Sequence, residues 1–180
     1  MGWFGYGKYD GDETSSVQTN MVEEIAKKFE IALFDKKGKS IEVDNLYLAK
    51  VDKGFLNESS AKAIAKHLDY ALDKIISKPK KSRKTGTVTW DDSTALEYMM
   101  VADFFMNHNL DIPEKHHKNF LVAVDFLTGE HASEFDTPGA RRRVLNKFIK
   151  DLDVYPNVTG ENAAQMDLFK DNSNVRKLKY

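Results

Sequence analysis

The residues best suited to chemistry in this sequence are the cations of one short stretch, residues 78–84. It reads Lys-Pro-Lys-Lys-Ser-Arg-Lys and offers no large apolar side chain that could join a core. Flexible basic segments bind phosphate backbones without sequence choice, and a nearby aromatic ring can stack on a base. We therefore predict an exposed, flexible basic loop over residues 78–86 that could bind a phosphate backbone. The alternative is that this loop is a solvated linker with no binding role. The side chains assigned to a partner or anion contact are Lys80, Lys81, Arg83, Lys84 and Trp90.

The second cationic cluster consists of three consecutive arginines, Arg141, Arg142 and Arg143. They fall in the first turns of a predicted helix, where the helix dipole disfavours positive charge. Glu134 and Asp136 precede them and could supply compensating negative charge. The planar fork of the guanidinium group also suits a phosphate or an acidic partner. We assign these arginines as a further candidate contact, with a solvated helix face as the alternative.

Carboxylates near the start of the chain could hold a hard cation. Asp10, Asp12 and Glu13 lie close together, but a calcium loop that begins at Asp10 requires glycine at its sixth position and glutamate at its twelfth. The chain has Ser15 and Met21 there. A structural role is favoured instead, in which Asp10 bonds a turn and Asp12 caps the first helix.

The histidines do not form a zinc motif. His116 and His117 are adjacent and would project about 100° apart on a helix, so they cannot easily face one ion. Glu114 and His117 could bind a metal together with His108 or His131 across a loop, but solvated or capping roles are favoured. The chain also lacks cysteine and a Gly-x-Ser-x-Gly elbow, so we assign no catalytic, cofactor-binding or metal-binding residue.

Helical spacing of apolar residues predicts the elements that position these candidates. Three of the helices have candidate N-caps. These are Asn57 for the second helix, one of Asp91, Asp92 and Ser93 for the third, and Asp111 for the fourth. The expected helices cover roughly residues 14–28, 57–78, 92–108, 111–128 and 136–152, and a short sixth helix could follow near 163–169.

Proline and glycine mark where helices end. Pro79 ends the second predicted helix, and Gly129, in a left-handed conformation, ends the fourth. Lys37 and Gly38 lie between two apolar stretches, which favours a β-hairpin near residues 29–48. The alternative is that the first helix extends to about Phe34.

Composition predicts one domain. The chain has 180 residues, of which 41% are hydrophobic, enough for one sizeable core. We predict a mainly α fold, a compact multi-helix bundle of about five or six helices with one small β-hairpin. Residues 1–155 are expected to form this domain, and residues 156–180 a partly ordered C-terminal extension.

Charge and cysteine content narrow the possible partners. A net charge of −1 gives the whole molecule no general attraction to nucleic acid or anionic lipid. The absence of cysteine excludes disulfides and fits a reducing compartment. No signal peptide is visible, and no apolar run approaches the ~20 residues of a membrane span. We therefore expect a cytoplasmic protein, bacterial or viral, without a membrane partner or a cofactor.

The opening of the chain interleaves glycines with aromatic rings. Glycine lets the backbone bend while the rings fill gaps between helices, and the spacing fits neither a phosphate loop nor a dinucleotide loop. The pattern Met-Gly-x-aromatic-Gly-x-Gly-x-aromatic-Asp-x-Asp resembles the opening of a family of uncharacterised bacterial proteins. The resemblance implies a helical fold and, since relatives sometimes occur beside toxins or in mobile elements, an inhibitor or immunity role. The residues that match are Met1, Gly2, Phe4, Gly5, Gly7, Tyr9, Asp10 and Asp12.

Three functions follow as hypotheses. The leading one is a protein-binding module of unknown activity, for which an immunity or inhibitor role in bacterial or phage conflict is the suggested form, and a non-enzymatic role is favoured over an enzymatic one. The second is a nucleic-acid-binding accessory protein that uses residues 78–84. The third is a metal-dependent hydrolase that uses Asp10, Asp12 or His117.

Overall fold

The computed structural model describes residues 12–49, 51–129, 139–155 and 157–158. The predicted roles of the opening stretch therefore lie outside the described residues, as does the sixth helix predicted near 163–169. The capping bond predicted for the Asp12 side chain lies outside them as well. The opening residues concerned are Gly2, Phe4, Gly5, Gly7, Tyr9 and Asp10.

Within these residues the fold is mainly α, as the sequence predicted. No described helix has both the length and the apolar character needed to cross a bilayer. The α-helices are α1 (Asp12–Phe29), α2 (Glu58–Ala65), α3 (Leu68–Tyr70), α4 (Asp92–Asn107), α5 (Glu114–Thr128) and α6 (Ala140–Asp153). Shorter helical segments are the 3-10 helices η1 (Val43–Leu48) and η2 (Val51–Lys53) and the π-helical turn η3 (Ala71–Ile75).

The described strands are short and occur as separate pairs. The first two pairs are antiparallel and the third is parallel. The pairs are β1 (Leu33–Phe34) with β2 (Ser40–Ile41), β3 (Lys80–Lys81) with β4 (Val88–Thr89), and β5 (Ile112–Pro113) with β6 (Asn157–Val158).

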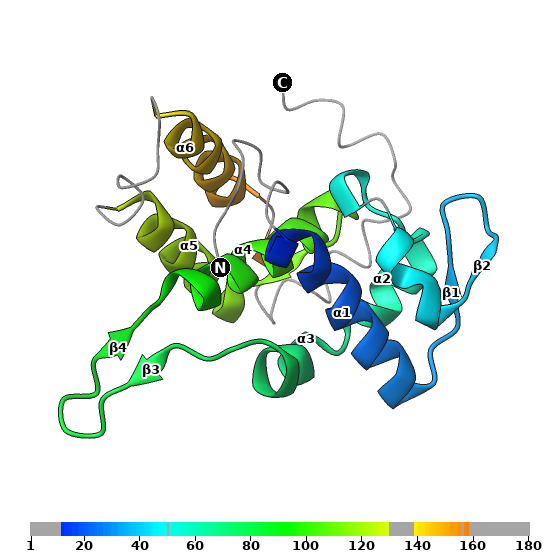
Figure 1. Ribbon diagram of the computed structural model, residues 1–180, viewed down its shortest axis with the longest axis horizontal. Coiled ribbons are helices and arrows are strands. Elements are labelled where there is room, and N and C mark those ends of the chain that lie inside the picture. The colour runs from blue at the N-terminus through cyan, green and yellow to red at the C-terminus, as the bar shows by residue number, and fades with distance from the viewer. Residues whose placement is uncertain (1–11, 50, 130–138, 156, 159–180) are drawn as a thin grey trace.

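Helix α4 forms the centre of the molecule, as expected for a helix that is apolar around most of its circumference. Its Met99, Met100 and Phe104 are among the largest side chains that are fully buried. Helix α1 packs on one side of α4 and α5 on another, and α6 packs on α5 (Figure 1). The buried residues of these helices join in a single core.

Two predicted N-caps are confirmed by their hydrogen bonds. The Asn57 side chain accepts a hydrogen bond from the backbone N–H of Ser60 at 2.9 Å, at the start of α2. The Asp91 side chain accepts one from the N–H of Thr94 at 2.9 Å, at the start of α4. Both helices therefore begin where local side-chain chemistry satisfies an otherwise unpaired amide.

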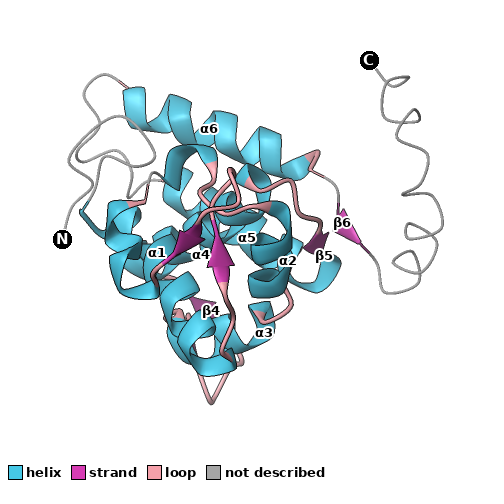
Figure 2. Cartoon of the chain, turned by 90° about the vertical axis from the view of Figure 1, so that its right-hand side faces the viewer, coloured by secondary structure: helices cyan, strands magenta, loops and turns pink. Residues whose placement is uncertain are grey.

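The ends of α5 differ from the prediction. Asp111 does not cap the helix, because Pro113 directly precedes it and no side chain caps its first turn. Ile112 and Pro113 instead run extended and pair with β6, as Figure 2 shows. Gly129 does follow the last helical residue, but its φ of −70° is not left-handed.

The long helix predicted from Asn57 to Pro79 is broken in the middle. Helix α2 ends at Ala65, and a turn at residues 66–67 leads into α3 and the π-helical turn η3. At this turn the ring of His67 stacks on Phe29 with the ring centroids 3.6 Å apart. A contact with the end of α1 therefore accompanies the break, which the apolar periodicity of the segment did not predict.

The hairpin predicted near residues 29–48 is confirmed. Helix α1 ends at Phe29, so the alternative of a helix extended to Phe34 is wrong. The Asp35 carboxylate accepts hydrogen bonds from the N–H groups of Lys37 and Lys39, and Gly38 has a φ of 80°. This turn chemistry matches the Lys-Gly signal in the sequence.

Candidate functional site

The basic stretch of the sequence folds into a hairpin, here called the basic hairpin (residues 78–89). Strands β3 and β4 pair Lys80 with Thr89 and Lys81 with Val88. The N–H of Ser82 donates to the carbonyl of residue 87 at 2.9 Å, which extends the ribbon toward its tip. Figure 1 shows the hairpin projecting from the helical body. The loop predicted over 78–86 therefore contains a short paired strand at Lys80–Lys81, and its flexibility stays a prediction.

The basic hairpin is exposed along its length. Every side chain from residue 80 to residue 89 is exposed, which confirms that the stretch contributes nothing to the core. Among the described strands, β3 and β4 pair only with each other, so both outer edges of the ribbon are unpaired. The hairpin is thus an appendage whose side chains and backbone face solvent.

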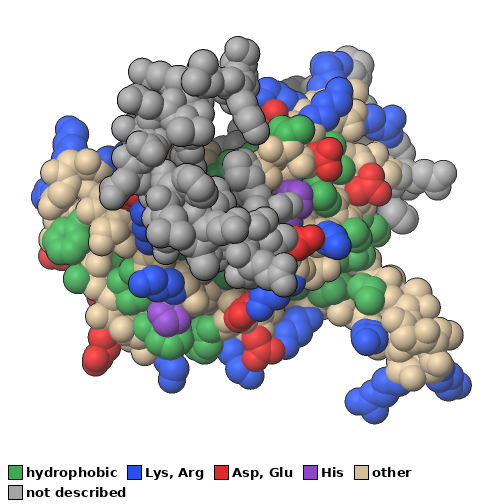
Figure 3. All heavy atoms as spheres, turned by 180° about the vertical axis from the view of Figure 1, so that it is seen from behind, with side chains coloured by type: hydrophobic (Ala, Val, Ile, Leu, Met, Phe, Trp, Pro, Cys, Tyr) green, Lys and Arg blue, Asp and Glu red, His purple; other side chains and the backbone are tan. Residues whose placement is uncertain are grey.

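The charge on the basic hairpin is all of one sign. It carries five cationic side chains and no carboxylate. Lys78 forms an ion pair with Asp73, whose pKa is lowered to about 2 by its contacts with Lys74 and Lys78. The other four cations form no ion pair with any residue that the structure describes. Figure 3 shows blue side chains and no red ones on the projecting ribbon.

Both ends of the basic hairpin are fixed to α4. Before the hairpin, the N–H and hydroxyl of Ser77 donate to the carboxylate of Glu97 at 2.6 and 3.1 Å. After the hairpin, the half-buried ring of Trp90 packs edge-on against Tyr98 with centroids 5.0 Å apart. These contacts set the direction in which the ribbon leaves the body. Stacking of Trp90 on a base stays a prediction, and this contact with the core restricts it.

Asp91, at the base of the hairpin, is committed to structure. Its hydrogen bond with the N–H of Thr94 is the main cause of a lowered pKa, and the nearby charge of Lys80 lowers the pKa further. A carboxylate held ionised by a helix start cannot serve as a general acid near neutral pH. Asp91 is therefore unsuited to act as a general acid beside the hairpin.

The arginine cluster lies apart from the basic hairpin. Arg142 and Arg143 are exposed on α6, while the side chain of Arg141 is outside the described part, as are Glu134 and Asp136. Figure 1 shows α6 and the hairpin at opposite ends of the same side of the molecule. The two predicted cationic contacts are therefore separate surfaces.

The buried and half-buried histidines are bound to other groups of the protein. His117 lies 2.6 Å from the carbonyl oxygen of Leu152, and His116 lies 2.6 Å from the carboxylate of Asp69. His108 bonds to the backbone N–H of Phe55 and to the backbone carbonyl of Phe104 in α4. Nowhere in the described ranges do three metal-ligating side chains cluster. Glu114, His117 and His108 do not come together as a metal-binding set, and the alternative set that includes His131 lies outside the described residues.

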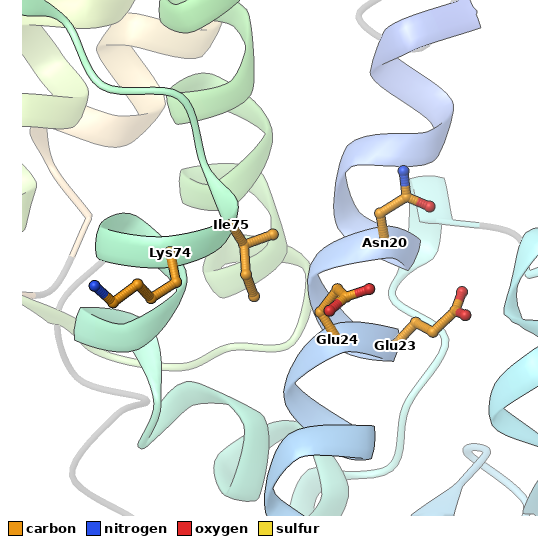
Figure 4. A pocket seen from close by; sticks show the side chains of 5 residues that line it. All are labelled: Asn20, Glu23, Glu24, Lys74 and Ile75. Carbon is orange, nitrogen blue, oxygen red and sulfur yellow. The ribbon is translucent and has the colours of Figure 1, made fainter.

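The clefts of the described part of the chain include two of similar size. The first, of about 460 Å³, is lined by Asn20, Glu23 and Glu24 of α1 and by Lys74 and Ile75 of the π-helical turn, and Figure 4 shows the amino group of Lys74 directed away from α1. Glu23 is paired with Lys27 at 2.7 Å, so part of its charge is already compensated. The second, of about 480 Å³, lies beside the buried His108. Neither cleft presents a nucleophile with an adjacent base.

Sequence reasoning located the cations of this site but missed their ribbon geometry and the Ser77–Glu97 contact. No apolar alternation marks β3 and β4, so the only local signal was the glycine at position 86, which has a φ of 70° in the turn. The predicted likeness of the opening stretch to bacterial proteins stays a prediction. Comparison with family models, curated proteins and solved structures finds no match to this chain.

Proposed function

We propose that this protein is a binding module that contacts the phosphate backbone of nucleic acid through the basic hairpin. The observation that carries this proposal is a projecting ribbon on which four cations lack an ion-pair partner among the described residues. Closely spaced cations repel one another and stay hydrated in solution, and a polyanion would neutralise this repulsion. A phosphate backbone supplies closely spaced negative charge to such a ribbon.

The near-neutral net charge of the molecule is compatible with this role. The net charge is −1, so the residues outside the hairpin are together negative. At physiological salt, charges more than about 8 Å apart in solvent are largely screened from each other. A ribbon that projects from the body therefore presents its own positive potential to a ligand that reaches its tip.

Fluorescence anisotropy with a labelled DNA duplex tests the proposal. We expect binding at ~50 mM salt and a plot of log affinity against log salt with a slope of about −0.9 for each phosphate contacted. Replacing Lys80, Lys81, Arg83 and Lys84 together by Gln should abolish most of this binding.

A matched variant separates the hairpin from overall charge. Lys37, Lys39, Lys66 and Lys118 are exposed elsewhere, and replacing all of them by Gln removes the same charge. We expect this control to bind nearly as well as the unmodified protein. Equal losses in the two variants, or no binding of the unmodified protein at ~50 mM salt, would contradict the proposal.

A protein partner is the second candidate, as an immunity or inhibitor protein would need. The observation that favours it is the pair of open strand edges on β3 and β4, since an extended segment of another protein can add to such an edge. The partner would be acidic, to match the hairpin. A stoichiometric partner retained by the control variant but lost by the hairpin variant in a pull-down would support this candidate.

A further inference from the structure

We infer that the basic hairpin enters the major groove of B-form DNA, which makes double-stranded DNA the preferred ligand of this protein. The inference rests on the proposed function and adds the kind of nucleic acid and the mode of contact. It is drawn from the distribution of side chains on the two faces of the ribbon, from the size of the ribbon and from its attachment to α4.

Cations lie on both faces of the ribbon. Lys80 and Lys81 are consecutive strand residues, so their side chains point to opposite faces, and both are exposed. Arg83 and Lys84 follow at the tip. A single backbone that lies along one face would leave half of this charge unused. A groove has a phosphate backbone on each side, so it matches cations on both faces.

The dimensions of the ribbon select among grooves. Two paired strands are about 4.8 Å apart before side chains are added. The major groove of B-form DNA, about 12 Å wide, admits a two-stranded ribbon without distortion, whereas the minor groove, about 6 Å wide, admits one only where the duplex is deformed. Duplex RNA has a deep and narrow major groove that side chains cannot read. B-form DNA is therefore the duplex that this ribbon fits.

The remaining side chains of the ribbon suit base edges. Thr85 and Thr87 lie at the tip with their hydroxyl oxygens 2.8 Å apart, and either hydroxyl can donate or accept. Val88 is exposed on the ribbon with 48% of its surface accessible, and its methyl groups are able to contact a thymine methyl. These hydroxyl and methyl groups could contact base edges in the groove once the cations have bound phosphates.

The attachment of the hairpin orients it at its base. Ser77 and Trp90 are fixed to α4 on either side of the ribbon, by hydrogen bonds and by ring packing. A ribbon whose direction is already set loses less conformational entropy on binding than a free loop does. This favours insertion into a groove, which needs a defined approach.

The first test compares ligands of equal length and labelling at one salt concentration. We expect duplex DNA to bind more tightly than duplex RNA or single-stranded DNA, and methyl green, a major-groove ligand, to compete where the minor-groove ligand netropsin does not. Equal or tighter binding of single-stranded DNA or duplex RNA would overturn the groove inference but leave the proposed phosphate binding intact. Binding of poly-glutamate as tightly as duplex DNA overturns it in favour of an acidic protein. Failure of every ligand at ~50 mM salt would overturn both.

The second test measures whether both faces make contact. Lys80→Gln and Lys81→Gln, made singly, should each weaken duplex binding and each reduce the magnitude of the salt slope by about 1. Lys37→Gln, on the other exposed hairpin, is the control and should leave the slope unchanged. An effect confined to one of the two hairpin variants means that one face lies on the ligand, which is incompatible with insertion. Thermal melts of all three variants confirm that the fold is unchanged.

Discussion

His108 is neutral in the folded protein because of the way its two ring nitrogens are used. Nδ1 lies 2.8 Å from the carbonyl oxygen of Phe104, so this nitrogen carries the proton and donates it. Nε2 accepts hydrogen bonds from the backbone N–H groups of Phe55 and Leu56 at 3.1 and 3.2 Å. Burial is the main cause of a pKa below the usual 6.5, and the charge of Lys36 lowers it further.

The first prediction is a loss of stability in mild acid that depends on His108. Below about pH 6.5 the unfolded chain protonates this ring while the folded protein resists, so the free energy of unfolding falls as pH drops toward the folded pKa. His108→Leu should destabilise the protein at neutral pH by about 1–3 kcal/mol, because the N–H groups of Phe55 and Leu56 lose their acceptor. The difference between the free energies of unfolding of the two proteins, measured by urea denaturation, should become smaller as the pH falls. A difference that stays constant down to about pH 5 would contradict this account.

Gly54 lies beside the same ring and illustrates a position where only glycine fits. Its φ is +68°, and a Cβ placed there would lie 2.7 Å from the carbonyl oxygen of Asn107. Gly38 also has a positive φ, of +80°, but nothing lies within 4 Å of its Cβ position. A side chain at position 38 would meet backbone strain alone, whereas a side chain at position 54 would also clash with a backbone carbonyl.

The second prediction compares Gly54→Ala with Gly38→Ala. Gly38→Ala should cost only the left-handed strain, about 1–2 kcal/mol. Gly54→Ala should cost more, on the order of 3 kcal/mol or above, because a backbone carbonyl must also move. Chemical denaturation measures both. Equal costs would show that the loop carrying Gly54 relaxes away from α4 without penalty.

At the level of elements, the sequence predicted what depends on neighbouring residues. Asn57 and Asp91 cap their helices because a side chain and an amide three positions apart meet whenever a helix starts there. The break in the predicted helix at residues 66–67 was not predictable, because His67 meets Phe29 from a different element. Asp111 lost its capping role for a similar reason, since the residues after it pair with β6. In both cases a distant segment competed for the same backbone.

In the candidate site, too, some features could be predicted from the sequence and others could not. The identity and exposure of the cations of the basic hairpin could be predicted from composition alone. Their arrangement on opposite faces depends on residues 80 and 81 forming a strand that pairs with residues 88 and 89, which no apolar pattern specified. The anchoring of Ser77 by Glu97 likewise joins two elements, so sequence spacing could not reveal it.

The third prediction concerns the cap that starts α4. Asp91→Ala should destabilise the protein by about 1 kcal/mol, because the N–H of Thr94 loses its partner. Since the pKa of Asp91 is lowered in the folded protein, this contribution is present above the ordinary carboxyl pKa of 3.8 and is lost as pH falls through the folded value. Asp91→Asn keeps an acceptor and should retain most of the stability at neutral pH. Urea denaturation of the three proteins at neutral and acidic pH measures this; an Asn variant as unstable as the Ala variant would argue against a capping role.

At the scale of the whole molecule, stability and binding reside in different parts. The core joins residues of α1, α2, α4, α5 and α6, whereas no side chain from residue 80 to residue 89 is buried. The ribbon contributes charge and reach, while the helical body contributes the anchoring points on α4. Changes in one part should therefore leave the other nearly unaffected.

The fourth prediction tests this separation by shortening the basic hairpin. Residues 81–88 are replaced by Asn-Gly, a pair that closes a tight antiparallel turn between Lys80 and Thr89, which are already paired. The shortened protein should melt within a few degrees of the original, since it loses no buried apolar surface and small surface changes are usually worth less than about 0.5 kcal/mol. Binding to duplex DNA at ~50 mM salt should be lost, because the tip cations and one face of the ribbon are gone. A large drop in melting temperature would mean that the hairpin supports the body, and retained binding would place the nucleic-acid contact elsewhere, with the exposed Arg142 and Arg143 of α6 the next surface to examine.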